Sequence, residues 1–181
     1  MHGLNLIHWM QGTQCDLIKA KYEGVHHLSA GDLLRDAVKN GNTELEAIMK
    51  EGKLVPMEVT IGLLKDSMVA SGAKTFLIDG FPRAVDQAAA FVSQIMECVA
   101  VLYFDCTEEA MRERLLERGK TSGRADDNED TIVKRFRTFV EQSKAVIEEY
   151  KAKGKVFQIS SMQTPEDVFA EVTGALDTVL A

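Results

Sequence analysis

Short runs of apolar residues alternate along the chain with longer segments in which apolar residues recur every three or four positions. The short runs are rich in β-branched and aromatic residues and end in polar or turn residues, which is typical of buried strands. We predict strands at 75–79, 99–105 and 155–160, with shorter candidates at 25–28 and 4–8.

The longer segments have the period of amphipathic helices. We predict helices at 13–22, 30–40, 43–51, 57–70, 85–96, 108–118, 128–153 and 165–180. The last begins with Thr164 as a cap and Pro165 at the first helical position. Alternating strands and helices imply an α/β fold, an αβα sandwich with a parallel sheet covered on both faces.

Composition limits the class of protein. The chain has 181 residues, the size of one domain, and neither a repeat nor a low-complexity linker interrupts it. Its formal net charge of -7 argues against nucleic acid or an anionic membrane as the main partner. No apolar run is long enough to span a bilayer, and no Lys or Arg precedes Lys19, so the basic region of a signal peptide is lacking.

The cysteines and histidines do not predict a metal site. Cys15, Cys98 and Cys106 are an odd number without a CxxC pair, so we expect reduced thiols in a cytoplasmic protein, with the nucleus as a second possible location. The four histidines lack ligand spacing, so no resident metal is expected.

Polar motifs follow the predicted strands, where ligands of open α/β sheets bind. Gly80-Phe81-Pro82-Arg83 directly follows the 75–79 strand, and Arg35 lies two turns into the helix that follows Ser29. The polar segment 119–130, which we read as a mobile solvent-facing loop, has arginines within it and on both sides. Arginine suits phosphate because its planar group donates two parallel hydrogen bonds. Each motif alone also fits a solvated surface arginine.

Taken together, the motifs are more specific. In this order and spacing LSAGDLLR, KLVP, LIDGFPR and RGKTSGRADDN resemble nucleoside monophosphate kinases, the family that includes adenylate kinase and UMP-CMP kinase. The similarity runs from about Gly12 to the C-terminus. It implies a P-loop NTPase-like fold and a single kinase-like domain over 1–181, with a helical flap at 29–57 that binds the monophosphate and a short lid at 119–127.

The resemblance also implies a reaction and its residues. The γ-phosphate of ATP, bound with Mg²⁺ through the nucleotide phosphates, would pass to a nucleoside monophosphate on a monomeric enzyme. Catalytic roles fall to Asp79, Arg118, Arg124 and Arg135. Acceptor binding falls to Arg35, Lys53, Leu54, Val55, Gly80, Phe81, Pro82, Arg83, Gln87, Arg124 and Arg135, and ATP binding to Gly12, Thr13, Arg118 and Gln163. Asp126 and Asp127 would latch the arginines of the lid.

Two residues bear on the base of the acceptor. Ala30 in LSAGDLLR stands where adenylate kinases usually carry Thr, which favours UMP or CMP. Gln87 stands four residues after Arg83, where adenylate kinases read adenine with Gln. An amide both donates and accepts, so it can satisfy a purine or a pyrimidine edge. UMP or CMP is the expected acceptor, with AMP as the alternative.

The N-terminal segment departs from the family. The glycine-rich loop GxxxxGK, which cradles the ATP phosphates, should lie here. Instead Gln11 stands in place of the lysine, Met10 in place of the glycine, and His8 and Trp9 where small residues belong. We also expect the first strand to be absent or reduced to 4–8. Three accounts remain open: a truncated or misassembled gene product, a form that binds nucleotide without catalysis, and a rebuilt weak phosphate site.

Overall fold

The computed structural model describes residues 2–7, 11–124 and 126–180, and residues 2–7 and 11 by their backbone alone. Within these ranges five parallel strands form one sheet in the order β2-β3-β1-β4-β5. The strands are β1 (His2–Ile7), β2 (Val25–Ser29), β3 (Thr75–Asp79), β4 (Cys98–Asp105) and β5 (Val156–Ser160). The predicted parallel αβα sandwich is therefore confirmed.

The first strand corrects the sequence-based expectation. β1 is not absent: it covers His2–Ile7 and lies in the centre of the sheet, paired with β3 on one side and β4 on the other. Neighbouring strands satisfy the backbone of a segment whose own composition predicts a strand only weakly. Residues 8–10, which contain most of the non-matching loop, lie outside the described residues.

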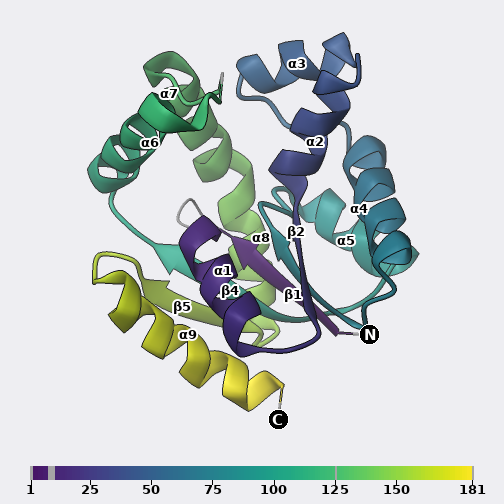
Figure 1. Cartoon of the computed structure of the whole chain (residues 1–181), viewed down its shortest axis with the longest axis vertical. Helices are drawn as coiled ribbons and strands as arrows, with labels where there is room; N and C mark the ends of the chain where they lie inside the picture. The colour runs from purple at the N-terminus through teal and green to yellow at the C-terminus, as the bar shows by residue number, and fades with distance from the viewer. Residues whose placement is uncertain (1, 8–10, 125, 181) are drawn as a thin grey trace.

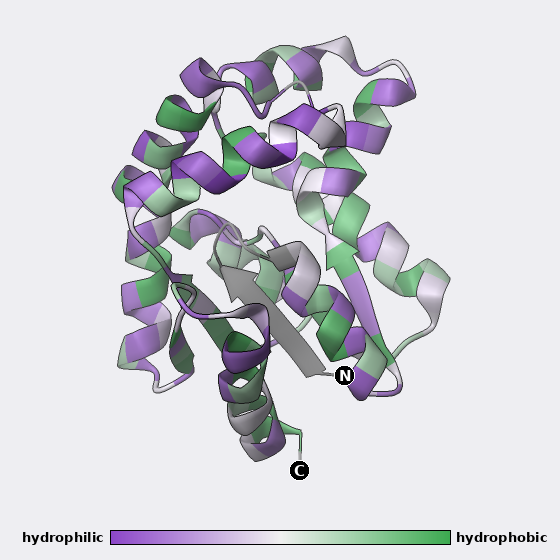
Figure 2. Cartoon of the chain, turned by 60° about the vertical axis from the view of Figure 1, so that its left-hand side comes forward, coloured by the Kyte–Doolittle hydropathy of each residue, from purple (hydrophilic) through white to green (hydrophobic). Residues whose placement is uncertain are grey.

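Helices cover both faces of the sheet (Figure 1). On one face α1 (Gln11–Lys21) and α9 (Pro165–Val179) pack together, and on the other lie α4 (Met57–Ser71), α5 (Val85–Gln94) and α8 (Lys144–Ala152). Figure 2 shows hydrophobic and hydrophilic residues interleaved along the same helices, as expected for helices with one buried side.

Successive residues of β3 pack into the core on opposite faces of the sheet. Leu77 packs with Cys15 and Ile18 of α1, whereas Phe76 and Ile78 pack with α4 and α5. All of them are fully buried. This alternation follows from the two-residue period of a strand, and it fixes the register that brings Asp79 to the carboxyl end of the sheet.

Four further helices stand above that end of the sheet (Figure 1). One pair is α2 (Ala30–Lys39) and α3 (Thr43–Lys50), and the other is α6 (Glu108–Ser122) and α7 (Glu129–Thr138). The predicted 128–153 helix is interrupted by a π-helical turn, η1 (Phe139–Ser143), between α7 and α8. A π turn of this kind often marks a functional site.

The segment 119–130 is not the solvent-facing loop that its polarity suggests. Residues 119–122 continue α6, which ends at Gly123 in a left-handed conformation. Asp126 and Asp127 are buried, and their charges are compensated by ion pairs with Arg135 and Arg118. Within the described residues, no helix has the length and apolar character needed to cross a membrane.

Candidate active site

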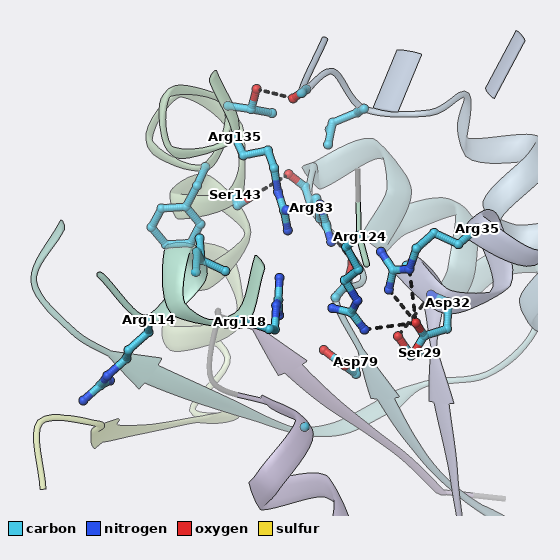
Figure 3. Close-up of a pocket in the computed structure, with 18 of the residues that line it drawn as sticks. Ser29, Asp32, Arg35, Asp79, Arg83, Arg114, Arg118, Arg124, Arg135 and Ser143 are labelled. Carbon is cyan, nitrogen blue, oxygen red and sulfur yellow. Dashed lines mark hydrogen bonds and ion pairs between the residues drawn. The ribbon is translucent and has the colours of Figure 1, made fainter. Parts of the chain in front are cut away.

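A cavity of about 440 Å³ lies at the carboxyl ends of β2 and β3, below α2, α6 and α7. Its size is in the range of small-molecule sites. Five arginines that the sequence singled out line it together with Asp79: Arg35, Arg83, Arg118, Arg124 and Arg135. Figure 3 shows these side chains converging from different elements above Asp79. The residues come from segments far apart in the chain, so the fold itself assembles the cluster.

Two buried aspartates hold the arginines of α6 and α7. Asp127 accepts two hydrogen bonds from Arg118, at 2.7 Å from Nε and 2.6 Å from Nη2. Asp126 Oδ2 accepts from Arg135 Nη1 at 2.8 Å, and the same nitrogen lies 3.4 Å from Asp127 Oδ1. Such forked, charge-assisted bonds fix the planes of the guanidinium groups.

A third aspartate joins the two helix pairs. Asp32 Oδ1, in the first turn of α2, accepts from Arg35 Nη2 at 2.5 Å and from Arg124 Nη2 at 3.1 Å. Arg124 follows the end of α6, so this carboxylate connects α2 to the segment after α6 across the cavity (Figure 3). Ser29 caps α2, since its side chain accepts from the Asp32 backbone N–H at 3.2 Å.

Arg83 is held by backbone contacts at the end of β3. Its Nε donates to the Gly80 carbonyl at 2.7 Å, and its own carbonyl accepts from Ser143 Oγ of the π turn at 2.9 Å. Gly80 has φ +74, and a Cβ there would lie 3.0 Å from Arg83 Nη2. The positive φ favours glycine here, and a Cβ would also force the Arg83 guanidinium to shift slightly.

The electrostatics of the cavity favour an added anion. Burial, and then the charge of Arg83, lower the pKa of Arg135 to about 9. Burial, and then neighbouring arginines, also lower the pKa of Arg124. Burial opposes the charged form of Arg118 too, but its bonds to Asp127 outweigh this and raise its pKa. Mutual repulsion of this kind is relieved when a phosphate binds among the guanidinium groups.

A smaller cavity of about 60 Å³ lies beside the first and shares several of its lining residues, among them Arg35, Arg83 and Arg135. The predicted acceptor residues Lys53, Leu54, Val55, Phe81 and Gln87 line it, beside Arg35, Gly80, Arg83 and Arg135. Gln87 is buried, and its Oε1 accepts from the Arg83 backbone N–H at 2.9 Å. Its amide nitrogen is thereby oriented away from that contact.

Of the remaining predicted residues, some line the main cavity and one lines neither cavity. Gly12 and Thr13, at the start of α1, line the main cavity, as does Pro82. Gln163 lines neither cavity; its amide donates to Glu171 Oε1 at 2.6 Å instead. Its assignment to ATP binding therefore receives no support from the geometry.

Sequence reasoning missed several residues that line the main cavity. These include His27, Asp32, Arg114, Phe139 and Ser143. Arg114 had no motif around it, yet it donates to the Ser161 carbonyl at 3.0 Å and borders the cavity. The position of Asp32 one turn before Arg35, on the same side of α2, is the one signal that could have been read in advance.

The parallel sheet, the cavity at its carboxyl edge and the convergent arginines define an α/β protein that binds phosphate groups. Residues 10–155 match the family model described as adenylate kinase. The chain is 51% identical over 173 residues to adenylate kinase isoenzyme 1 of Caenorhabditis elegans, covering 92% of this chain and 82% of that protein.

Two other relatives carry different names. A uridylate kinase of Saccharomyces cerevisiae is 46% identical over 173 residues, covering 92% of this chain and 84% of that protein. UMP-CMP kinase 3 of Oryza sativa subsp. japonica is 50% identical over 167 residues, covering 90% and 78%. The chain belongs to the adenylate kinase family, the class of ATP-dependent nucleoside monophosphate kinases.

Proposed function

We propose that this chain transfers the γ-phosphate of ATP to UMP or CMP, at a rate reduced by its altered phosphate loop. The observation that carries the proposal is the convergence of five arginines above Asp79. In this reaction an acceptor phosphate oxygen bonds to the γ-phosphorus while the bond from that phosphorus to the leaving ADP oxygen breaks. The protein mainly positions the two nucleotides and stabilises negative charge.

The arginines differ in the cavities that they border. Arg35, Arg83 and Arg135 border both cavities, so they would hold the acceptor monophosphate. Arg118 and Arg124 border the main cavity alone, where Arg118 would bind the ATP phosphates. Arg124 and Arg135 would contact both the acceptor and the transferring group, as the family resemblance implies. Three aspartates would orient arginine side chains before the substrates bind: Asp32 holds Arg124, Asp126 holds Arg135 and Asp127 holds Arg118.

The donor phosphates would meet the start of α1. Gly12 and Thr13 lie there at the edge of the cavity, and the first turn of the helix contains no acidic residue. The partial positive charge of a helix N-terminus stabilises a phosphate group. This is the part of the family's ATP site that the sequence retains.

The residues at the end of β3 fit the magnesium ion that accompanies ATP. Asp79 presents a carboxylate to the cavity, and Mg²⁺ prefers oxygen ligands and keeps several waters in such sites. We propose that Asp79 holds the ion through its waters. When bound, the ion would neutralise charge on the phosphates of ATP.

The base of the acceptor would enter the smaller cavity. Ala30 adds no hydroxyl to its lining, and Gln87 presents its amide nitrogen, because the amide oxygen is engaged by Arg83. Ala30, at a position where adenylate kinases usually carry Thr, favours UMP or CMP as the acceptor. AMP is the second candidate, since one amide donor also fits the ring nitrogen of adenine.

Substitution of the loop lysine limits the expected rate. Loss of one preorganised donor costs roughly 10²–10³ in kcat. With Gln11 in place of lysine and the glycine before it replaced by Met10, a loss of about four orders of magnitude in kcat is expected.

Residues 29–57 and 119–127 are proposed to close over the nucleotides as flap and lid. We propose that the enzyme acts as a monomer.

The test compares the protein with a loop-restored variant carrying Asn5→Gly, His8→Gly, Trp9→Ser, Met10→Gly and Gln11→Lys, which completes the GxxxxGK motif at residues 5–11. Each is assayed with MgATP and UMP, CMP or AMP. The proposal expects turnover that rises at least about 10²-fold on restoration, with UMP or CMP preferred. A preference for AMP would show that AMP, and not UMP or CMP, is the acceptor. No turnover by either folded protein would refute the kinase proposal, and equal turnover would refute the role given to the loop.

A further inference from the structure

Three side chains with metal-binding groups meet beneath the arginine cluster. Cys15 lies on α1, His27 on β2 and Asp79 at the end of β3. One ligand atom from each, a thiol sulfur, an imidazole nitrogen and a carboxylate oxygen, lie within 4.8 Å of one another. Pairing of β2 with β3 brings His27 level with Leu77, and Cys15 packs on Leu77 from the same face. The sheet and α1 therefore hold the three groups together.

His27 is the least satisfied member of this cluster. Its Nε2 is buried and has no hydrogen-bond partner among the described residues. The nearest acidic atom, Asp79 Oδ2, lies 3.8 Å away, which is too far for a hydrogen bond. Buried polar atoms without partners are uncommon, and an unplaced ion is one established reason for them.

The spacing suits a shared cation. With bonds of about 2.0–2.3 Å to nitrogen, oxygen and sulfur, two ligands of a tetrahedral zinc ion lie roughly 3.3–3.6 Å apart. The imidazole and carboxylate atoms are already at 3.8 Å, and the thiol sulfur would have to approach the other two atoms by about 1.2–1.5 Å at most. Rotation of the Cys15 and Asp79 side chains can supply such a movement.

The chemistry of the three groups selects the metal. Thiolate and imidazole ligands favour Zn²⁺ and other borderline or soft ions, whereas Mg²⁺ takes oxygen ligands. We propose that Cys15, His27 and Asp79 form a zinc-binding site at the floor of the nucleotide cavity, distinct from the magnesium that arrives with ATP.

The position of this site gives it a consequence for the enzyme. His27 and Asp79 line the main cavity, whereas Cys15 is fully buried behind them. Three protein ligands leave one tetrahedral position open. Because His27 and Asp79 line the cavity, water or a nucleotide phosphate oxygen there would complete the site. Zinc bound here would hold the Asp79 carboxylate and withdraw it from the magnesium of ATP. The ion therefore acts as an inhibitor.

Binding is measured on the purified, reduced protein with the metal alone. Co²⁺ is the optical probe, because a thiolate–cobalt bond gives a near-ultraviolet charge-transfer band that water or carboxylate ligands do not. The expected result is one equivalent of Co²⁺ bound with that band, and its displacement by Zn²⁺. At a zinc concentration about 100 times Kd, Tm should rise by roughly 5–10 °C.

Matched variants assign the ligands. Cys15→Ala should abolish the band, and His27→Gln and Asp79→Asn should each weaken metal binding at least roughly tenfold. The controls are Cys106→Ser and His26→Asn. His26 is adjacent to His27 but packs against Phe76 on the opposite face of the sheet, so this variant should bind like the parent. Circular dichroism establishes that each variant is folded, and three separate ligand variants keep the test independent of any one.

Several outcomes would overturn the site. These are absence of the thiolate band in the parent, an unchanged band in folded Cys15→Ala, or equal loss in the two controls. Kinase assays at fixed MgATP add a second measurement: zinc should inhibit the parent and the Cys106→Ser control, and a chelator should restore their activity. This arm rests on the proposed function, but the cobalt and Tm measurements do not, so failure of either proposal is recognised separately.

Discussion

The pair formed by Asp127 and Arg118 offers a direct test of how the arginine cluster is held. The Asp127 side chain is 0% exposed, whereas that of Arg118 is 34% exposed. Asp127 also accepts from Ser122 Oγ at 3.3 Å. Asp127→Asn keeps the shape of the side chain but removes its charge and one acceptor position, so Arg118 loses half of its forked contact.

The cost follows from these contacts. Hydrogen bonds to charged groups contribute about 1.5–3 kcal/mol each. One bond from Arg118 can persist to the amide oxygen, and its exposed portion can be hydrated, so we expect Asp127→Asn to lower the free energy of unfolding by about 2–3 kcal/mol. For a chain of this size that is roughly 4–12 °C in Tm.

The pH dependence gives the test a second measurement. Burial alone would raise the pKa of Asp127, but the bonds and charge of Arg118, followed by the charges of Arg135 and Arg124, outweigh burial and lower it. A lowered pKa means that the carboxylate stabilises the fold fully above the unfolded-state value near 3.9, and that this contribution is lost as pH falls through the folded value. The Tm gap between parent and variant should therefore be full at pH 7 and narrow below about pH 4.

Thermal unfolding followed by circular dichroism from pH 3 to pH 7 checks both expectations. Asp16→Asn is the control, because that side chain is 78% exposed and 3.9 Å from Lys19, so its effect should stay within about 0.5 kcal/mol. A Tm for Asp127→Asn equal to that of the control, or a gap that persists unchanged to pH 3, would contradict the reasoning.

Three further substitutions probe the same region. Gly119→Ala places a Cβ 2.5 Å from the Asp127 carbonyl oxygen, so Tm should fall by several degrees; an unchanged melting curve would mean that the backbone relaxes freely. Ser143→Ala removes the bond to the Arg83 carbonyl and should cost about 1 kcal/mol in denaturant unfolding, with a raised KM for the monophosphate. Arg135→Lys retains charge without the planar fork, so in the loop-restored protein kcat/KM should fall by roughly 10²-fold while the fold persists; a loss under threefold would remove Arg135 from the transfer step.

Much of the fold could be predicted because local pattern and tertiary packing agree. The strand at Thr75–Asp79 has the predicted bounds, and its alternating burial matches the two faces of the sheet. β1 was underestimated because its stability comes from β3 and β4 on either side, which a six-residue window cannot show. The extension of α6 to Ser122 was missed for a similar reason: the buried partners of its polar end lie in the following segment.

The candidate site was predictable where residues directly follow strands. Arg83 and Asp79 lie at the end of β3 as expected, because parallel strands present their carboxyl ends at one edge. The bridge from Asp32 to Arg124 could not be predicted, since it joins residues far apart in sequence. The same holds for the proposed zinc ligands. A short sequence motif detects ligands that lie close together in the chain, whereas these three residues lie on three separate elements.

The proposed roles would separate acceptor binding from phosphoryl transfer. Arg35 and Arg124 donate to Asp32, Arg83 donates to Gly80, and Arg135 donates to Asp126. We expect changes at residues 8–11 to weaken ATP binding and transfer more than binding at the proposed monophosphate site. Asp79 belongs to both proposed sites, because it lines the cavity with the arginines and is also a member of the proposed zinc site. A ligand that captures Asp79 would stop transfer while monophosphate binding persists.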